Sequence, residues 1–169
     1  MASRGQALSA VMCAMAILVL VCPGAAKAAR SPDLLRGLHA VVLHVDSWGG
    51  VPVRGIPTEV RRMLSEAGVK VLDDTDRSAP ADAPQLWLTM TLACQDAACG
   101  YAVRLELEDG VRLARAPLTA GRAVVWANGI QNAIRRPDTL ALPDVYAAES
   151  RALVMGFLQD LHEAGRRGR

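Results

Sequence analysis

Residues 85–108, QLWLTMTLACQDAACGYAVRLELE, decide the fold of this chain. Apolar and polar side chains alternate along both halves of the stretch, on either side of a short break at 95–98. Alternation with a period of two is typical of strands that bury one side and expose the other. We therefore predict two antiparallel strands, over Gln85–Ala93 and from Tyr101 onward, joined by a tight turn.

The two cysteines near this turn fit the same register. If Leu92 faces Tyr101, the apolar residues of both strands share one side of the sheet, and Cys94 lies opposite Cys99 on that side. A disulfide between them is therefore predicted. Two alternatives are a redox-active pair and a metal site. Redox motifs usually place their cysteines three apart at the start of a helix, and two thiols with no nearby histidine do not complete a zinc shell.

The second strand is expected to continue past Asp109-Gly110, although this dipeptide is typical of tight hairpins. A two-residue turn there would pair Leu107 with Arg112 and mix charge with the apolar side. In one continuous strand, Leu107 and Val111 stay on the same side, with a kink or bulge at Gly110. A further strand is predicted over Ala123–Ala127.

The flanking segments complete an α/β (α+β) fold. Leu38–Val45 is apolar on both sides, as in a central strand, and a helix is expected from about Pro57 to a stop at Gly68. Val69–Leu72 then begins a strand parallel to the first. The final helix is predicted from about Pro143 to Ala164. The expected result is a mixed five-stranded sheet, in the order β-α-β-β-β-β-α along the chain, with the helices packed on one face.

The beginning of the chain has the pattern of a secretory signal peptide over residues 1–28. Arg4 precedes an apolar run over Leu8–Val21, and small residues surround a cleavage point near Ala28. Residues 29–165 would then form a single domain, followed by a basic tail over 166–169. Lipid modification of Cys22 is the alternative, although the bulky Val21 precedes it. Either route predicts a periplasmic or secreted protein, with no membrane span after removal of the signal.

Composition argues against nucleic-acid binding. The whole chain carries 19 basic and 17 acidic residues, and Arg4 and Lys27 would leave with the signal peptide. The mature domain would then be close to neutral, whereas nucleic-acid binders have a basic excess.

Candidate binding residues lie on the side of the strands that faces away from the apolar set. Trp87 stands across from Glu106 and Thr89 across from Arg104, with Trp126 joining them if its strand faces the same way. A half-exposed tryptophan can mark a binding surface. No catalytic triad, phosphate-binding loop, cofactor motif or complete metal site is recognised, and Asp73–Asp76 lacks the glycine and the glutamate of a calcium loop.

One acid–base pair remains as a catalytic alternative. His44 and Asp46 share a side of one strand and could form a hydrogen-bonded couple in a small periplasmic hydrolase. The same pattern is also typical of a histidine near the end of a strand.

The order of elements, together with Leu35–Val45, Ser65–Val69 and Val125-Trp126, resembles a group of small exported bacterial proteins of unassigned function. These are similar in turn to α/β domains of envelope components, including the amino-terminal domain of the translocation protein TolB. The resemblance implies an architecture and no catalytic residues. We therefore expect a non-catalytic envelope domain that binds a protein or envelope partner through its sheet face. The alternatives are the hydrolase and a lipid-anchored envelope subunit.

Overall fold

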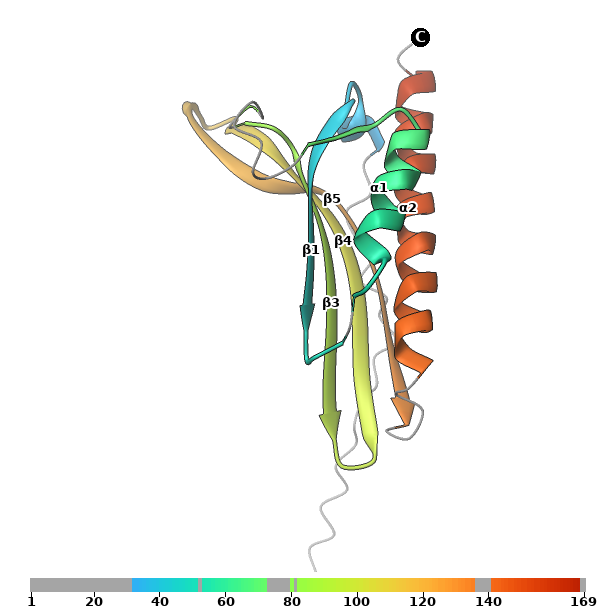
Figure 1. Ribbon diagram of the computed structural model, residues 1–169. Helices are drawn as coiled ribbons and strands as arrows, with labels where there is room; N and C mark the ends of the chain where they lie inside the picture. The colour runs from blue at the N-terminus through green and yellow to red at the C-terminus, as the bar shows by residue number, and fades with distance from the viewer. Residues whose placement is uncertain (1–31, 52, 73–79, 81, 136–140, 168–169) are drawn as a thin grey trace, which may run out of the picture.

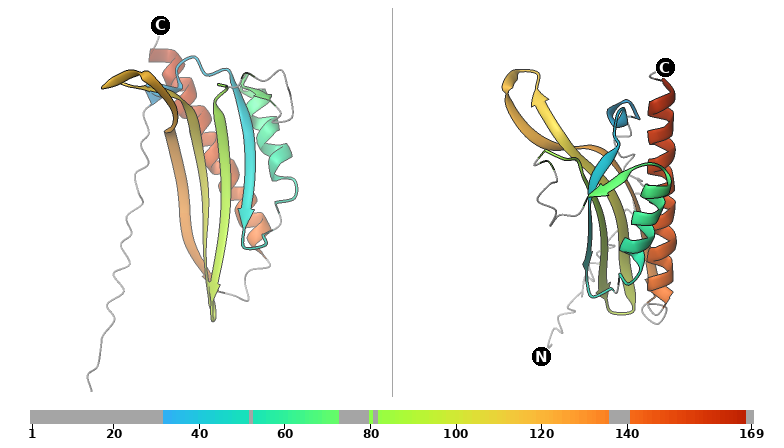
Figure 2. Two further views of the ribbon diagram at one scale, coloured as in Figure 1. Left: turned by 90° about the vertical axis from the view of Figure 1, so that its left-hand side faces the viewer. Right: turned by 45° about the horizontal axis from the view of Figure 1, so that its top comes forward.

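Among the described residues, helices α1 and α2 lie on one side of a five-stranded sheet and no helix lies on the other side (Figures 1 and 2). The computed structural model describes residues 32–51, 53–72, 80, 82–135 and 141–167. The predicted signal peptide and most of the loop expected over Asp73–Pro84 lie outside the described residues, as does much of the irregular segment expected before the last helix.

The sheet has the strand order β2-β1-β3-β4-β5, in which β1 runs parallel to both of its neighbours and the remaining pairs are antiparallel. This arrangement confirms the predicted mixed sheet. The elements follow one another as η1 (Pro32–Leu35), β1 (Ala40–Trp48), α1 (Ile56–Glu66), β2 (Lys70–Leu72), β3 (Gln85–Gln95), β4 (Ala98–Leu113), β5 (Ala116–Arg135) and α2 (Leu142–Arg167).

Helix α1 begins and ends as its sequence indicates. Pro57 lies in the first turn, where a missing N–H costs little. Gly68 adopts a φ of +83° after the last turn, its N–H bonds to Ser65 O, and the Val69 N–H bonds to Leu64 O. This pattern of bonds ends helices in which a glycine takes the left-handed conformation. Helix α2 covers Leu142–Arg167 and so runs three residues beyond the end expected at Ala164.

Strand β4 is continuous through Asp109-Gly110, as predicted, but the irregularities lie elsewhere. The β4–β5 register shifts between Leu107 and Glu108 and again between Arg112 and Leu113, not at Gly110. Strand β5 is also four times longer than the expected Ala123–Ala127, at 20 residues. Its additional residues include alanines, glycines and asparagines, which have weak strand propensity, and their strand structure comes from pairing with β4.

Strand β3 begins at Gln85, which pairs with Glu108 of β4. Past this pair, over residues 109–123, β4 and β5 pair with each other and form a two-stranded arm. Figures 1 and 2 show the arm bending away from the helices, toward the open side of the sheet. The Arg122 guanidinium donates a hydrogen bond to the Ala83 carbonyl and ties the arm to the segment before β3.

The main core lies between the sheet and the helices. It contains the inward residues of β3 and β4, together with one stripe of α2: Leu86, Leu88, Met90, Val103, Leu105, Leu107, Tyr146, Leu153, Val154 and Phe157. A second, smaller cluster of Val42, Leu72 and Ala83 lies on the other side of the sheet. Strand β1 therefore buries residues on both sides, as its apolar sequence predicted. In the described part of the chain, no helix has the length and apolar character needed to cross a membrane.

Candidate docking surface on the open sheet face

Four of the predicted site residues come together on the helix-free side of the sheet. Trp87 pairs with Glu106 and Thr89 pairs with Arg104 in the β3–β4 register, as the alternation predicted. Trp87, Thr89 and Glu106 are half-buried and Arg104 is exposed. We call this side of the sheet the open face. On β1 it includes His44, Asp46 and Trp48.

Strand β1 adds an aromatic contact that the sequence did not reveal. His44 pairs with Trp87 in the parallel β1–β3 register, and the two rings stack with centroids 4.0 Å apart and an interplanar angle of 13°. Stacked aromatic pairs add a favourable interaction beyond the area they bury. Within the described residues, the buried His44 Nε2 and Trp87 Nε1 atoms have no hydrogen-bond partner.

The end of β1 carries the most exposed tryptophan of this face. Trp48 pairs with Thr91, and 66% of its surface is accessible. Asp46, also exposed, pairs with Thr89, and this pair lies between the Trp48–Thr91 pair and the His44–Trp87 pair. The open face therefore combines an exposed indole, the His44–Trp87 stack, hydroxyl groups and charges of both signs.

The charged part of the open face is held by local contacts. The Arg104 guanidinium lies 2.5 Å from a Glu106 carboxylate oxygen. Gly129 of β5 faces Arg104, and a Cβ there would approach Arg104 Cγ to 3.2 Å. A glycine at this position leaves room for the arginine side chain to lie across β5.

Trp126 does not join the open face, which corrects the prediction. Its side chain is fully buried on the helix side, where it meets Phe157 edge-on at 5.0 Å and its Nε1 donates to Asp160 Oδ2 at 2.9 Å. The β4–β5 register explains this placement, because Trp126 pairs with Leu107 and directly opposed residues share a side of the sheet. The register shift comes just after this pair, where Val125 is the extra residue.

His44 and Asp46 do share the open face, as the hydrolase alternative required. In the described residues no hydrogen bond joins them, and His44 is covered by the Trp87 ring. Neither residue lines the pocket between α1 and α2 or the pocket beside the start of β1. No cluster of three metal-ligating side chains occurs in the described ranges.

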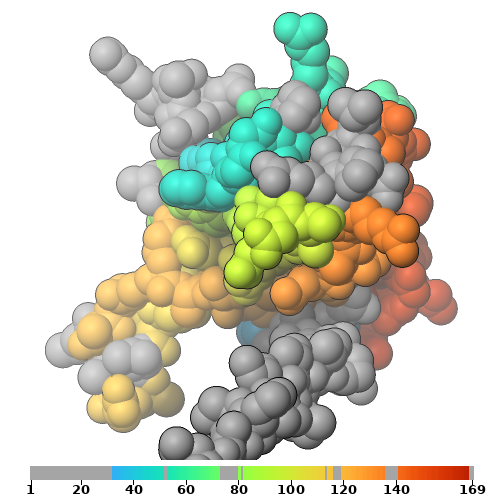
Figure 3. All heavy atoms as spheres, turned by 90° about the horizontal axis from the view of Figure 1, so that it is seen from below, coloured from blue at the N-terminus to red at the C-terminus, as the bar shows by residue number. Residues whose placement is uncertain are grey.

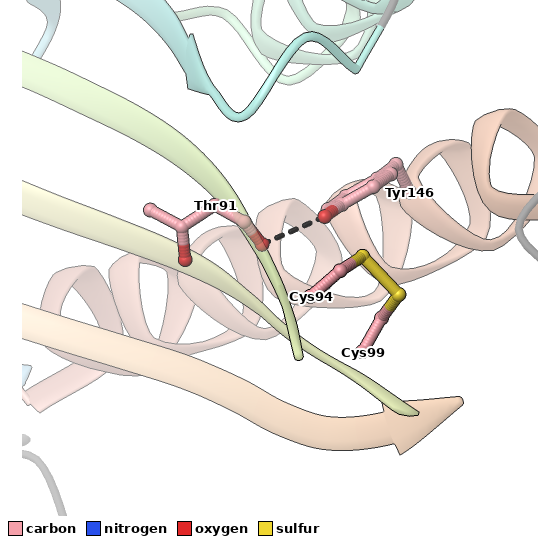
Figure 4. The surroundings of a disulfide bond; sticks show 4 residues. All are labelled: Thr91, Cys94, Cys99 and Tyr146. Carbon is pink, nitrogen blue, oxygen red and sulfur yellow. Dashed lines mark hydrogen bonds between the residues drawn. A yellow bond between two sulfur atoms is a disulfide. The ribbon is translucent and has the colours of Figure 1, made fainter. Parts of the chain in front are cut away.

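The predicted disulfide is present. Cys94 and Cys99 are bonded at the tip of the β3–β4 hairpin, on the same side of the sheet as the core. Figure 3 views this end of the molecule, with the hairpin tip between the segment after β1 and the region of β5 and α2. In Figure 4 the Tyr146 hydroxyl points past the disulfide toward β3, where it donates to the Thr91 carbonyl at 2.7 Å.

Comparisons with known proteins do not assign a family. No family model and no curated protein matches the chain. Among solved structures, a variant PelC dodecamer from Paraburkholderia phytofirmans is 17% identical, with a TM-score of 0.39 over 75% of this chain and 89% of that one. A minor lipoprotein from Acinetobacter baumannii is 11% identical, with a TM-score of 0.34 over 75% and 92%. At these values the matches carry no argument about function, and they do not confirm the resemblance to TolB.

Proposed function

We propose that this chain is an exported, non-catalytic envelope domain that binds a protein partner through the open face. Two features support export: the signal-peptide pattern of residues 1–28, and the Cys94–Cys99 disulfide, a bond typical of oxidising compartments. Lipid anchoring through Cys22 remains the alternative form of the same proposal.

The observation that carries the binding proposal is the exposed Trp48 on the same side of the sheet as the stacked rings of His44 and Trp87, four residues along β1 from His44. Tryptophan is enriched among the residues that contribute most to protein interfaces, where an apolar centre is surrounded by polar groups. Thr89, Arg104 and Glu106 supply such a polar border. A protein with an apolar side chain flanked by charges of both signs would complement this surface.

A capture experiment tests the proposal. The mature domain is used as bait against an envelope fraction, and the captured protein is identified by mass spectrometry and then titrated in purified form. Trp48→Ala and Trp87→Ala are expected to weaken its binding at least tenfold. Met155→Ala is the matched control, because Met155 is 58% exposed on the helix side. Equal binding by all three variants would reject the open face as the docking surface.

The mature amino terminus decides between free and anchored forms. Mass spectrometry of the exported protein is expected to find a free end at Ala29 or Arg30. An acylated Cys22 would instead support the lipid-anchored subunit.

A further inference from the structure

A pocket separate from the open face lies between the start of α1 and the middle of α2. Its volume is about 290 Å³, at the lower end of the range for small-molecule sites. Arg54, Glu59 and Arg151 provide its charged groups, and Ile56 and Val60 provide apolar walls. Because both helices cover the other side of the sheet, nothing in the proposed docking function uses this pocket.

Ser150 is the unusual residue of this pocket. It lies in the buried stripe of α2, is only 1% exposed, and its hydroxyl has no hydrogen-bond partner among the described residues. A buried hydroxyl without a partner is destabilising, and helical serines often bond to the carbonyl four residues earlier. The Ser150 hydroxyl makes no such bond to Tyr146. Ser150 lines the pocket but its oxygen is buried, so the hydroxyl would reach a ligand by rotation of the side chain toward the pocket.

The charges around the pocket favour an anion. Arg54 makes no side-chain hydrogen bond or ion pair with the described part of the chain. Gly55, the residue just before α1, provides no side-chain cap, and the amino-terminal end of a helix carries partial positive charge. The negative charge of Glu59 is partly balanced by Arg62, which donates two hydrogen bonds to it, at 3.1 and 2.9 Å, and a third to Glu66 at 2.6 Å. The bonds from Arg62, and more weakly Arg151, lower the pKa of Glu59.

We propose that this pocket binds a small organic oxyanion, a carboxylate or a phosphate ester with a short apolar body. The Ser150 hydroxyl would donate to an anion oxygen, Arg54 and Arg151 would balance its charge, and the apolar body would lie against Ile56 and Val60. The N-terminal end of α1 strengthens the preference for negative charge. The site needs no part of the open face.

Titration of the mature protein with defined probes tests the class of ligand. Sodium butyrate and butyl phosphate are added while amide NMR signals of residues 54–60 and 147–151 are followed, with butanol and sodium chloride at matched ionic strength as controls. Saturable shifts confined to these segments are expected with at least one of the two anions, and the one that binds identifies the preferred headgroup. Shifts equal to those from sodium chloride, or shifts with butanol alone, would overturn the proposal.

Variants then separate the site from general charge effects. Arg54→Gln and Ser150→Ala are each expected to weaken anion binding about tenfold, as loss of one charge-assisted bond does. Arg167→Gln, which removes the same charge at the far end of α2, is expected to bind normally. Equal weakening in Arg54→Gln and Arg167→Gln would reduce the effect to overall charge and overturn the site.

Ser150→Ala also distinguishes binding from packing. Because its hydroxyl is unpartnered, the ligand-free variant is expected to melt at the same temperature as the wild type or higher. A lower melting temperature would mean that the hydroxyl already has a structural partner, and would contradict its assignment as a ligand donor. Trp48→Ala is expected to retain full anion binding, so this site and the docking surface can fail independently.

Discussion

The two sides of strand β3 come from one alternating sequence but lie in different environments. Leu86, Leu88 and Met90 are completely buried beneath the helices, whereas Trp87 and Thr89, between them in the sequence, stay half-buried on the open face. Alternation assigns each residue to a side, but the helices determine which side becomes core. Stability should therefore depend mainly on the inner side, and recognition on the outer side.

The largest contrast is expected between two tryptophans. Trp126→Ala removes a fully buried indole and its bond to Asp160, and should lower the free energy of unfolding by about 3–5 kcal/mol. Trp48→Ala, on the open face, should change it by less than about 0.5 kcal/mol. Urea denaturation of both variants measures the difference. A similar loss in both would show that the open face is covered in solution.

The disulfide is expected to have the next largest effect. Replacing Cys94 and Cys99 by serine should destabilise the domain by about 2 kcal/mol, the chain-entropy value for such a short loop. Urea titrations with and without reductant should separate for the wild type and coincide for the double variant. A reductant effect on the double variant would instead point to a cause other than this bond.

A single hydrogen bond from α2 to β3 should contribute less. Tyr146→Phe removes the donor to the Thr91 carbonyl while keeping the ring against Tyr101, and should cost about 1 kcal/mol. Thr89→Val, a change on the open face of the same strand, is the control and should be nearly neutral. If the two variants are equally stable, the bond contributes nothing.

The smallest effect concerns alkaline pH. Burial, and to a lesser extent Tyr101, raise the pKa of Tyr146 above its ordinary value of 10.0. The folded protein therefore holds this proton more tightly than the unfolded chain. The stabilisation is complete below pH 10 and is lost as the pH rises through the folded-state pKa. Unfolding free energies measured between pH 8 and pH 11 should fall more for the wild type than for Tyr146→Phe.

The sequence predicted the β3–β4 hairpin well because the residues that pair in it lie close together in the chain. The β3–β4 register and the Cys94–Cys99 pairing both followed from alternation and side-chain parity. The same parity argument ruled out a turn at Asp109-Gly110, and β4 is continuous there. These features involve residues close in the chain, where few alternative pairings compete.

Other features depended on contacts between distant segments. The His44–Trp87 stack requires β1 to lie parallel to β3, which nothing in either strand's own sequence specifies. The facing of Trp126 depends on the register between β4 and β5, in which Trp126 pairs with the buried Leu107. The pocket at Ser150 exists only because α1 packs against α2, so a serine within an apolar stripe gave no sign of it.

The covalent link at the hairpin tip also protects the chain from misassembly as it folds. With Cys94 fixed opposite Cys99, the two strands cannot slide past each other by one position. Such a slide would turn every leucine of one strand toward water and carry its charged residues, Arg104 among them, beneath the helices. Early oxidation of this hairpin would thus fix the inner and outer sides of β3 and β4 before strand β5 and the more distant helix α2 are added.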